Sequence, residues 1–358
     1  MKIVSIGQQI MIKWESASQL NFFRHLLRFS LGLGLLTGLS TCTTDFEVEA
    51  DWKDIPIVYG FLSTQDTAHY LRIEKAYLEP GGNALTIAQI ADSIYYGPEV
   101  QVMLEKIATG ELFVLERVDG NLEGYVRESG VFAHQPNILY KIKKEDINLK
   151  TADEVRLTID RGAGKELVTA ETVVIGDLRL IETLPREPIT LGGYNSELRI
   201  GWEVSTFAQL FDLRFVIHYL ESRPDDPAVF DPKTLEFVLD KSIEREDESN
   251  RVSYFLRSGD FFQYLSANLT VLNSGVRFFQ GIDIGLVAAG EEFLELSKIG
   301  QANLGITSAN EVPIYTNLSE GRGIFSSKAT ALRENLSLGP VSLDSLRNGI
   351  FTRDLGFQ

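Results

Sequence analysis

Cysteine and histidine, two residue types that build reactive sites, are scarce in this chain of 358 residues. Cys42 is its one cysteine, which excludes a disulfide within the chain and a zinc site built from thiolates. The four histidines are His25, His69, His134 and His218, and none has a second histidine or cysteine at ligand spacing. The sequence therefore predicts histidines on strand surfaces or in the core, no metal site and no cofactor.

Basic residues and long apolar runs are scarce as well. The chain has 34 Lys and Arg against 50 Asp and Glu, a formal net charge of −16. Nucleic-acid binding needs a basic face, so no nucleic-acid partner is expected. No segment after Cys42 is apolar enough to span a bilayer, which takes about 20 residues.

Common catalytic and binding motifs are also missing. There is no Gly-x-Ser-x-Gly elbow, although a serine and a histidine brought together by folding would leave no such motif. Asp225, Asp226 and Asp231 offer oxygen ligands to Ca²⁺ but lack the EF-hand order, which favours a solvated loop. In residues 321–323, Gly-Arg-Gly is followed by Ile-Phe, so we expect a turn with positive φ and no phosphate loop.

Aromatic residues leave two interpretations open. Tyr95, Tyr96, Phe261, Phe262 and Tyr264 are candidates for a platform on which a sugar stacks. Large aromatic side chains more often pack in cores, and core packing is the favoured interpretation here.

The most informative segment is residues 24–42, RHLLRFSLGLGLLTGLSTC. A basic start, a short apolar run and small residues before Cys42 are typical of a secretory signal. Leu39-Ser40-Thr41-Cys42 resembles the bacterial lipobox, in which the cysteine is acylated and becomes the new N-terminus. We therefore expect residues 1–41 to be a signal peptide with an over-long start, and Cys42 to bind membrane lipid through its acyl chains.

Removal of residues 1–41 takes away four basic residues and one acidic residue, which changes the formal charge from −16 to −19. Residues 42–53 form an acidic tether. We expect a β-sandwich domain over 54–175, a linker rich in proline over 176–188, and a second β-rich domain with a few short helices over 189–358.

The fold class that follows is mainly β, with an immunoglobulin-like sandwich first. Short apolar or alternating runs between turn signals predict the strands 55–62, 68–78, 100–106, 111–118, 139–143, 154–160, 166–174, 196–203, 210–221, 235–239, 251–256 and 276–289. Helical spacing and capping residues predict helices over 84–91, 261–269 after Asp260, 291–298, and 343–347 after Ser342.

Three phrases carry a resemblance to a known family: IPIVYGFLSTQDTAHYLRIEKAYL, NALTIAQIADSIYYGPEVQVMLE and NLSEGRGIFSSKAT. In this order they resemble an uncharacterised lipoprotein family of the Bacteroidota envelope, a domain of unknown function. The resemblance covers most of the chain after Cys42. It implies a lipid-anchored outer-membrane protein, often found with transport systems of the TonB-dependent kind, and it supplies no catalytic residues and no cofactor.

Two further features concern the surface. Thr67, Ser93 and Ser345 each follow an aspartate in a short pattern that resembles the O-glycosylation acceptor of Bacteroidota proteins. Residues 79–98 form a long excursion, which we interpret either as a contact element or as a cover for the open edge of the sandwich.

These observations predict a lipid-anchored outer-membrane lipoprotein that acts as a non-catalytic binding or accessory module, with an outer-membrane transporter as the expected partner. The alternatives are an envelope hydrolase that acts on glycan or peptide, and a purely structural envelope protein.

Overall fold

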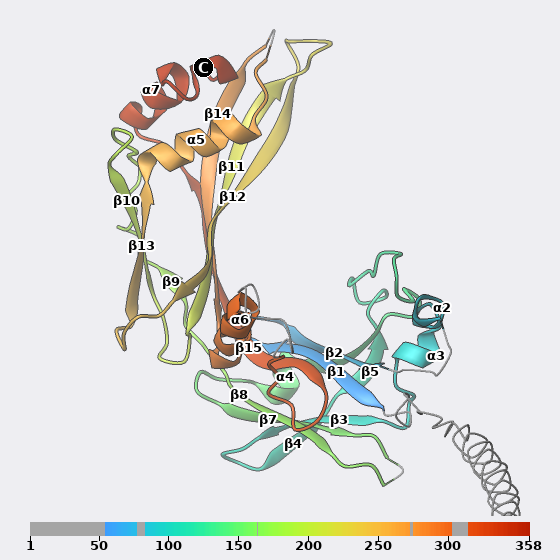
Figure 1. Cartoon of the computed structure of the whole chain (residues 1–358). Helices are drawn as coiled ribbons and strands as arrows, with labels where there is room; N and C mark the ends of the chain where they lie inside the picture. The colour runs from blue at the N-terminus through green and yellow to red at the C-terminus, as the bar shows by residue number, and fades with distance from the viewer. Residues whose placement is uncertain (1–53, 77–82, 163, 273–274, 303–313) are drawn as a thin grey trace, which may run out of the picture. The chain divides into compact units, whose positions relative to one another are not determined.

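One long sheet connects all parts of the fold (Figure 1). The computed structural model describes residues 54–76, 83–162, 164–272, 275–302 and 314–358, which belong to a compact unit running from Trp52 to Gln358. The predicted signal, the tether and Cys42 lie outside the described residues.

The long sheet has eight strands in the order β12-β11-β14-β15-β1-β2-β6-β5. Their bounds are β12 Phe230–Glu244, β11 Leu210–Ser222, β14 Arg277–Ala289, β15 Arg322–Leu336, β1 Ile55–Leu62, β2 Ala68–Ala76, β6 Ile138–Lys143 and β5 Glu116–Asp119. β1 and β15 are parallel, whereas the other neighbours are antiparallel. Figure 1 shows blue β1 beside orange-red β15, so a late strand completes the sheet that the first strand begins.

Glycine permits the close approach of these two parallel strands. Gly321 and Gly323 have φ of 119° and 101°, which confirms the predicted positive φ. The predicted turn over 321–323 is wrong in part, because β15 already begins at Arg322 and pairs there with β1. A Cβ atom on Gly323 would lie 2.0 Å from the carbonyl oxygen of Val58 in β1. Any larger residue at 323 would therefore push β15 away from β1.

A four-stranded sheet covers one part of the long sheet. Its order is β4-β3-β7-β8, with β4 Glu111–Val114, β3 Gln101–Lys106, β7 Glu154–Asp160 and β8 Val168–Val173. Alternating residues of both sheets meet in a buried core, as the period of two in a strand requires. Examples are Val58 and Leu71 from the long sheet and Leu104 and Leu157 from the small one. We call this part the lower sandwich.

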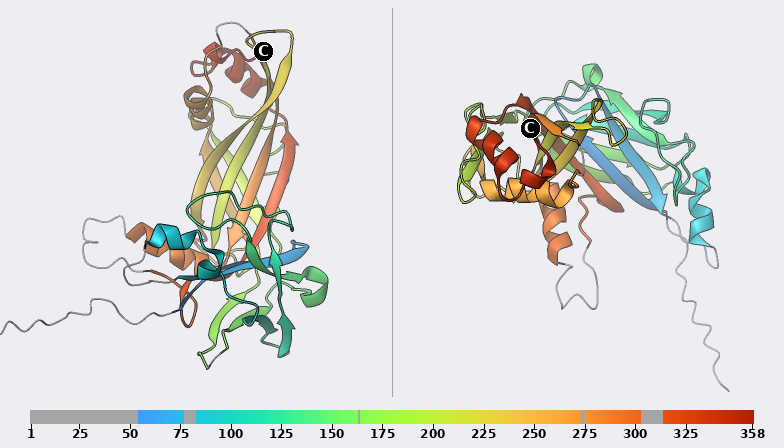
Figure 2. Two further views of the ribbon diagram at one scale, coloured as in Figure 1. Left: turned by 90° about the vertical axis from the view of Figure 1, so that its right-hand side faces the viewer. Right: turned by 90° about the horizontal axis from the view of Figure 1, so that it is seen from above.

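A three-stranded sheet and two helices cover the other part of the long sheet, which we call the upper sandwich. The strands are β13 Arg251–Arg257, β10 Glu197–Glu203 and β9 Arg179–Leu180, and the helices are α5 Ser258–Asn268 and α7 Pro340–Asn348. Trp202, Phe211 and Phe261 are in its core. Figure 2 shows the C-terminus at this end of the fold, away from the lower sandwich.

The remaining helices lie in connections. They are α2 Ala84–Ala88, α3 Ala91–Ile94, α4 Lys144–Ile147, α6 Glu291–Ala302 and the 3-10 turn η1 Arg353–Leu355. All of them except α6, which has 12 residues, are short. The predicted mainly β fold with few helices is confirmed. None of the helices in the described part of the chain is long and apolar enough to cross a membrane.

Several local predictions were wrong. Asp260 and Ser342 lie inside α5 and α7, whose N-caps are Arg257 and Gly339. The buried Ser342 hydroxyl accepts from the Leu191 N–H instead, so a tertiary contact uses its capping capacity.

The strand predictions also missed features that depend on tertiary pairing. The single strand predicted over 111–118 is two strands, because β4 pairs with β3 and β5 pairs with β6 of the other sheet. No strand was predicted over 322–336, where β15 lies, and β12 is longer than the predicted 235–239.

The domain division at residues 176–188 stays a prediction. Two observations bear on it: β9 lies within that segment and pairs with β10, and β15 from the later half pairs with β1 of the earlier half.

Candidate functional site

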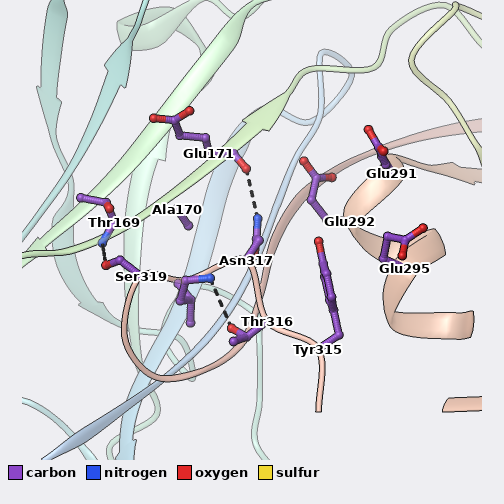
Figure 3. Close-up of a pocket in the computed structure, with 11 residues that line it drawn as sticks. Thr169, Ala170, Glu171, Glu291, Glu292, Glu295, Tyr315, Thr316, Asn317 and Ser319 are labelled. Atoms are coloured by element: carbon purple, nitrogen blue, oxygen red, sulfur yellow. Dashed lines mark hydrogen bonds between the residues drawn. The ribbon is translucent and has the colours of Figure 1, made fainter. Parts of the chain in front are cut away.

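A pocket of about 540 Å³ lies between β8, the start of α6 and the segment that leads into β15 (Figure 3). Its lining has four glutamates, one tyrosine and no basic residue: Thr169, Ala170, Glu171, Glu291, Glu292, Glu295, Tyr315, Thr316, Asn317, Leu318 and Ser319. We call it the acidic pocket.

Hydrogen bonds between the two chain segments hold one wall of the acidic pocket. Asn317 donates from Nδ2 to the Glu171 carbonyl at 3.0 Å and to the Phe325 carbonyl at 2.6 Å. The Thr169 N–H donates to Ser319 Oγ at 2.9 Å, and the Ser319 N–H donates to the Thr169 carbonyl at 2.8 Å. Asn317 and Ser319 thus form hydrogen bonds with backbone groups on the outer edge of β8.

Glu292 is the most constrained carboxyl of the acidic pocket. Burial raises the pKa of Glu292, while Ser326 donates from Oγ to its Oε2 at 2.8 Å. Burial and the nearby Glu292, Glu295 and Glu291 raise the pKa of Tyr315. The pocket favours positive charge, and the described residues contain no group of three or more His, Cys, Asp or Glu that would hold a metal.

A second candidate is an apolar lobe, which we define as residues 83–97 and 119–137. It lies beside the end of β2, where Tyr95 forms an isolated bridge with Glu74. The Ala133 N–H donates to the Ala88 carbonyl at 2.7 Å, which joins its two segments. Its outer surface carries large exposed apolar residues: Leu85, Ile90, Leu122, Tyr125, Val126, Val131 and Phe132.

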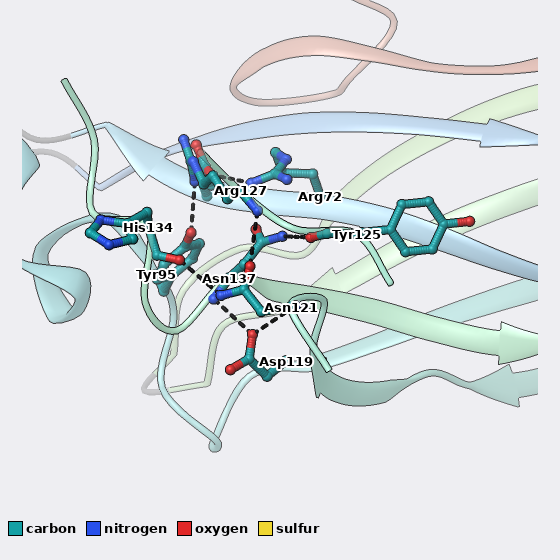
Figure 4. A network of polar contacts seen from close by, with 9 residues as sticks. Arg72, Tyr95, Asp119, Asn121, Tyr125, Arg127, His134 and Asn137 are labelled. Carbon is teal, nitrogen blue, oxygen red and sulfur yellow. Dashed lines mark hydrogen bonds and ion pairs between the residues drawn. The ribbon is translucent and has the colours of Figure 1, made fainter. Parts of the chain in front are cut away.

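A network of polar contacts fixes the lobe from within (Figure 4). Arg127 donates from Nη1 to Glu74 Oε1 and to the Tyr95 hydroxyl, both at 2.7 Å. The Arg127 N–H donates to Asn121 Oδ1 at 2.9 Å, and Asn121 Nδ2 donates to the His134 carbonyl at 2.9 Å. Side chains thus replace the regular backbone ladder that this long segment lacks.

Asp119 and Asn137 close the base of the lobe. Asp119 Oδ1 accepts from the N–H groups of Asn121 and Asn137 at 3.0 and 2.9 Å. Asn137 donates from Nδ2 to the Tyr125 carbonyl at 2.7 Å, and the Tyr125 ring packs against Tyr70 of β2 with centroids 4.6 Å apart. The exposed apolar side chains therefore stand on an ordered loop.

A buried ionic cluster joins the first described residue to the foot of the lobe. The Tyr96 hydroxyl donates to Asp54 Oδ1 at 2.6 Å, and Lys165 Nζ donates to Asp54 Oδ2 at 2.8 Å. Arg161 donates from Nη1 to the Asp54 carbonyl at 3.1 Å and from Nη2 to Glu320 Oε2 at 2.5 Å. Burial and the Asp54 carboxylate raise the pKa of Tyr96, so its hydroxyl remains a donor.

The residues predicted to accept O-linked glycans lie on three separate parts of the chain, and the fold does not bring them together. Thr67 is exposed in the turn between β1 and β2, whereas Ser93 in α3 and Ser345 in α7 are half-buried. Cys42, the predicted lipidation residue, lies outside the described residues. Accessibility therefore favours Thr67 among the three.

The histidines behave in different ways. Both ring nitrogens of buried His69 have no hydrogen-bond partner in the structure, and burial lowers its pKa. His69 is thus a core histidine, as predicted, but one without a hydrogen-bond partner. His218 Nε2 lies 2.8 Å from Asp283 Oδ2, and His134 is half-buried in the lobe.

The remaining candidates have structural partners. Arg223 contacts Asp231 through Nε at 3.0 Å and Nη2 at 2.7 Å, which lowers the pKa of Asp231 and occupies its carboxylate. Tyr95, Tyr96, Phe261 and Phe262 are buried, as core packing requires. Tyr264 stacks on Phe237 with ring centroids 4.0 Å apart.

Sequence reasoning missed both candidate sites in part. The excursion 79–98 was singled out by its length, but the segment 119–137 that packs against it was not. The near absence of strand and helix periodicity over 119–137 was the available signal. The acidic pocket was missed as well. Glu291, Glu292 and Glu295 are close together in α6, but nothing local in the sequence places them against Glu171 of β8.

Comparisons with known proteins leave these sites unassigned. No protein-family model matches the chain, and no curated protein matches it. Among solved structures, the C-terminal globular domain of an oligosaccharyltransferase from Pyrococcus abyssi is 13% identical over 66% of this chain and 46% of that one, with a TM-score of 0.25. The chain thus spans under half the length of that protein. CBD12 from CALX1.2 is 7% identical over 76% of this chain and 98% of that one, with a TM-score of 0.17.

Proposed function

We propose that this chain is an outer-membrane lipoprotein, anchored by acylated Cys42, that acts as a non-catalytic binding or accessory module. The observation that carries the proposal is the apolar lobe: exposed apolar side chains on an ordered loop make a contact surface. Its polar network preorganises that surface, which lowers the entropy lost on binding. The signal-like segment ending at Cys42 supplies the anchor.

The resemblance to Bacteroidota envelope lipoproteins supports an outer-membrane transporter of the TonB-dependent kind as a partner. The finer fold assignment belongs to the same proposal: residues 54–175 make up an immunoglobulin-like sandwich that takes β15 from the later half. Two packed sheets with a buried core between them support this assignment.

The test is affinity purification of the full chain from native outer membranes, beside a Cys42→Ser variant. The full chain should be acylated, resist a carbonate wash and bring a membrane protein with it in stoichiometric amount. Cys42→Ser should appear in the soluble fraction. A variant that stays membrane-bound after the wash would contradict the lipid anchor.

A hydrolase acting on glycan or peptide is the second candidate, and one observation favours it. Glu292 has a raised pKa and lies in a pocket among other carboxyl groups, as a general acid of glycan hydrolysis would. Turnover of a glycan by the purified chain, lost in Glu292→Gln and retained in Glu295→Gln, together with recovery of no partner, would replace the binding proposal. A purely structural role would show neither a partner nor turnover.

A further inference from the structure

Asp54, the first described residue, lies at the foot of the lobe in the lower sandwich. Tyr96 follows the C-cap residue of α3, and its hydroxyl donates to the buried Asp54 carboxylate at 2.6 Å. Asp54 and Cys42 are twelve residues apart. A chain of that length spans at most about 40 Å. An acylated Cys42 would therefore keep Asp54, which is bonded to the foot of the lobe, within that distance of the lipid surface.

Charge is unevenly distributed over the lobe. Its first segment, residues 83–97, contains a single charged residue, Asp92, whereas its second segment contains Asp119, Glu123, Arg127 and Glu128. An acidic body is repelled by an anionic lipid surface, so a nearly uncharged segment is the part that can approach one closely.

Four of the exposed side chains, on α2, Ile90 and residues 131–132, have the chemistry that suits lipid. Leu85, Ile90, Val131 and Phe132 are aliphatic or phenyl groups without a hydrogen-bonding tip. Contact sites for proteins are instead dominated by Trp, Tyr and Arg anchors. Gln89 donates from Nε2 to the Gly130 and Val131 carbonyls at 2.6 and 2.7 Å, so α2 and residues 130–132 present these groups together.

We propose that the outer surface of the apolar lobe, around Leu85, Ile90, Val131 and Phe132, inserts into the interface of the lipid bilayer that holds the anchor. The inference rests on the proposed lipid anchor and names the bilayer as what the lobe contacts. Apolar groups at such an interface are buried about 5–10 Å deep, at the boundary of headgroups and acyl chains. Two attachment points, the acyl chains and the lobe, would fix the orientation of the body on the membrane.

The experiment places a tryptophan on the lobe and quenches it with brominated lipid. The full chain is coupled through Cys42, its one thiol, to a maleimide phospholipid in vesicles of phosphatidylethanolamine and phosphatidylglycerol. Leu85→Trp is compared with Ile350→Trp, because Leu85 and Ile350 are both 65% exposed. Ile350 follows α7 in the upper sandwich, away from the lobe. The emission of unsubstituted chain is subtracted from both.

Tryptophan at 85 should be quenched at least about threefold more strongly by acyl-chain bromines than tryptophan at 350, with a blue-shifted emission. Adding Ile90→Asp and Val131→Asp to Leu85→Trp should remove the difference. Equal quenching at 85 and 350 overturns the inference. Shielding of residue 85 in native membranes without quenching in pure lipid also overturns it and assigns the lobe to a protein partner.

Chemical coupling through Cys42 makes this result independent of native acylation. A chain that is not acylated in cells but quenches at residue 85 when coupled would overturn the proposed anchor and leave the lobe as a lipid-contacting surface. A chain that is acylated in cells but shows no quenching at residue 85 would support the proposed anchor and overturn the lipid contact of the lobe.

Discussion

The upper and lower sandwiches each bury a basic side chain, and they do so in opposite ways. Arg277 in the upper sandwich and His69 in the lower one are both 1% exposed. Arg277 pairs with Glu221 through Nε at 2.7 Å and Nη2 at 2.6 Å, and Nη1 donates to the Thr270 and Leu355 carbonyls at 2.8 and 2.7 Å. His69 has no partner for either nitrogen in the structure.

The comparison shows that a buried polar side chain can have hydrogen-bond partners or lack them. Arg277 joins β11, the end of α5 and η1, so a group that is expensive to bury organises three chain segments. His69 joins nothing, and its surroundings include Asp66, Lys144 and Lys328 from the turn before β2, α4 and β15. At equal burial, hydrogen-bonded Arg277 is expected to stabilise the upper sandwich, whereas unpartnered His69 is expected to destabilise the lower one.

The largest effect is expected for Arg277→Met. It leaves Glu221 without its buried partner and two carbonyls without donors, which should lower the free energy of unfolding by about 3–5 kcal/mol. Urea denaturation measures the change. Arg199→Met, at an exposed position of β10, is the matched control and should change stability by less than about 1 kcal/mol. Equal effects would mean that Arg277 contributes only its volume.

An intermediate effect of opposite sign is expected for His69→Leu. Removing an unpartnered buried polar group should raise the free energy of unfolding by about 1–2 kcal/mol at pH 8. The gain should grow at lower pH. Burial lowers the pKa of His69 from 6.5, so the unfolded chain binds a proton more readily than the folded one.

The sign of the pH dependence follows from that difference. The stability of the wild-type chain should fall as the pH drops from about 6.5 toward the lowered pKa, by up to about 1.4 kcal/mol per pH unit. His69→Leu lacks this loss. Urea denaturation at pH 8 and pH 5, with half-buried His134→Asn as control, checks it. If the stability gained by His69→Leu were the same at pH 8 and pH 5, protonated His69 would have to find a hydrogen-bond partner in the folded chain.

The smallest effect is expected when the chain is cut between the halves. Trypsin should cut after Arg186, which is exposed within the predicted linker 176–188. The two fragments should still elute together, because β15 remains paired with β1 and β14. Separate elution would show two independent domains. Resistance there, while the chain is cut after exposed Lys150 in the connection before β7, would indicate that the linker is part of a continuous sheet.

Local pattern was enough to predict many strands. The bounds of β1 and β7 match the predicted 55–62 and 154–160, because β1 is a β-branched and aromatic run and β7 alternates apolar with polar residues, each between clear turn signals. β15 escaped prediction because its buried positions include Ser326 and Ser327, which read as polar. Their hydroxyls bond to Glu292 and to the Val173 carbonyl, partners that no local pattern shows.

The candidate sites were less predictable for the same reason. Length alone marked the excursion 79–98, and the structure supports both of its interpretations: Tyr95 covers the edge of β2 at Glu74, while Leu85 and Ile90 remain exposed. Nothing in the sequence places residues 119–137 against this excursion. The contacts that join them, such as Arg127 to Tyr95, link side chains that are 32 residues apart in the sequence.

The parallel pairing of β1 with β15 sets an order on synthesis and folding. β1 contacts β15 at six positions from Ile57 to Leu62, and its partners there begin at Arg322. A ribosome must therefore complete most of the chain before the first strand can acquire its neighbour on that side. Such long-range contacts slow folding, since the ends of a very long loop must meet. One edge of β1 therefore stays open until synthesis is nearly finished, and an open strand edge can pair with other chains.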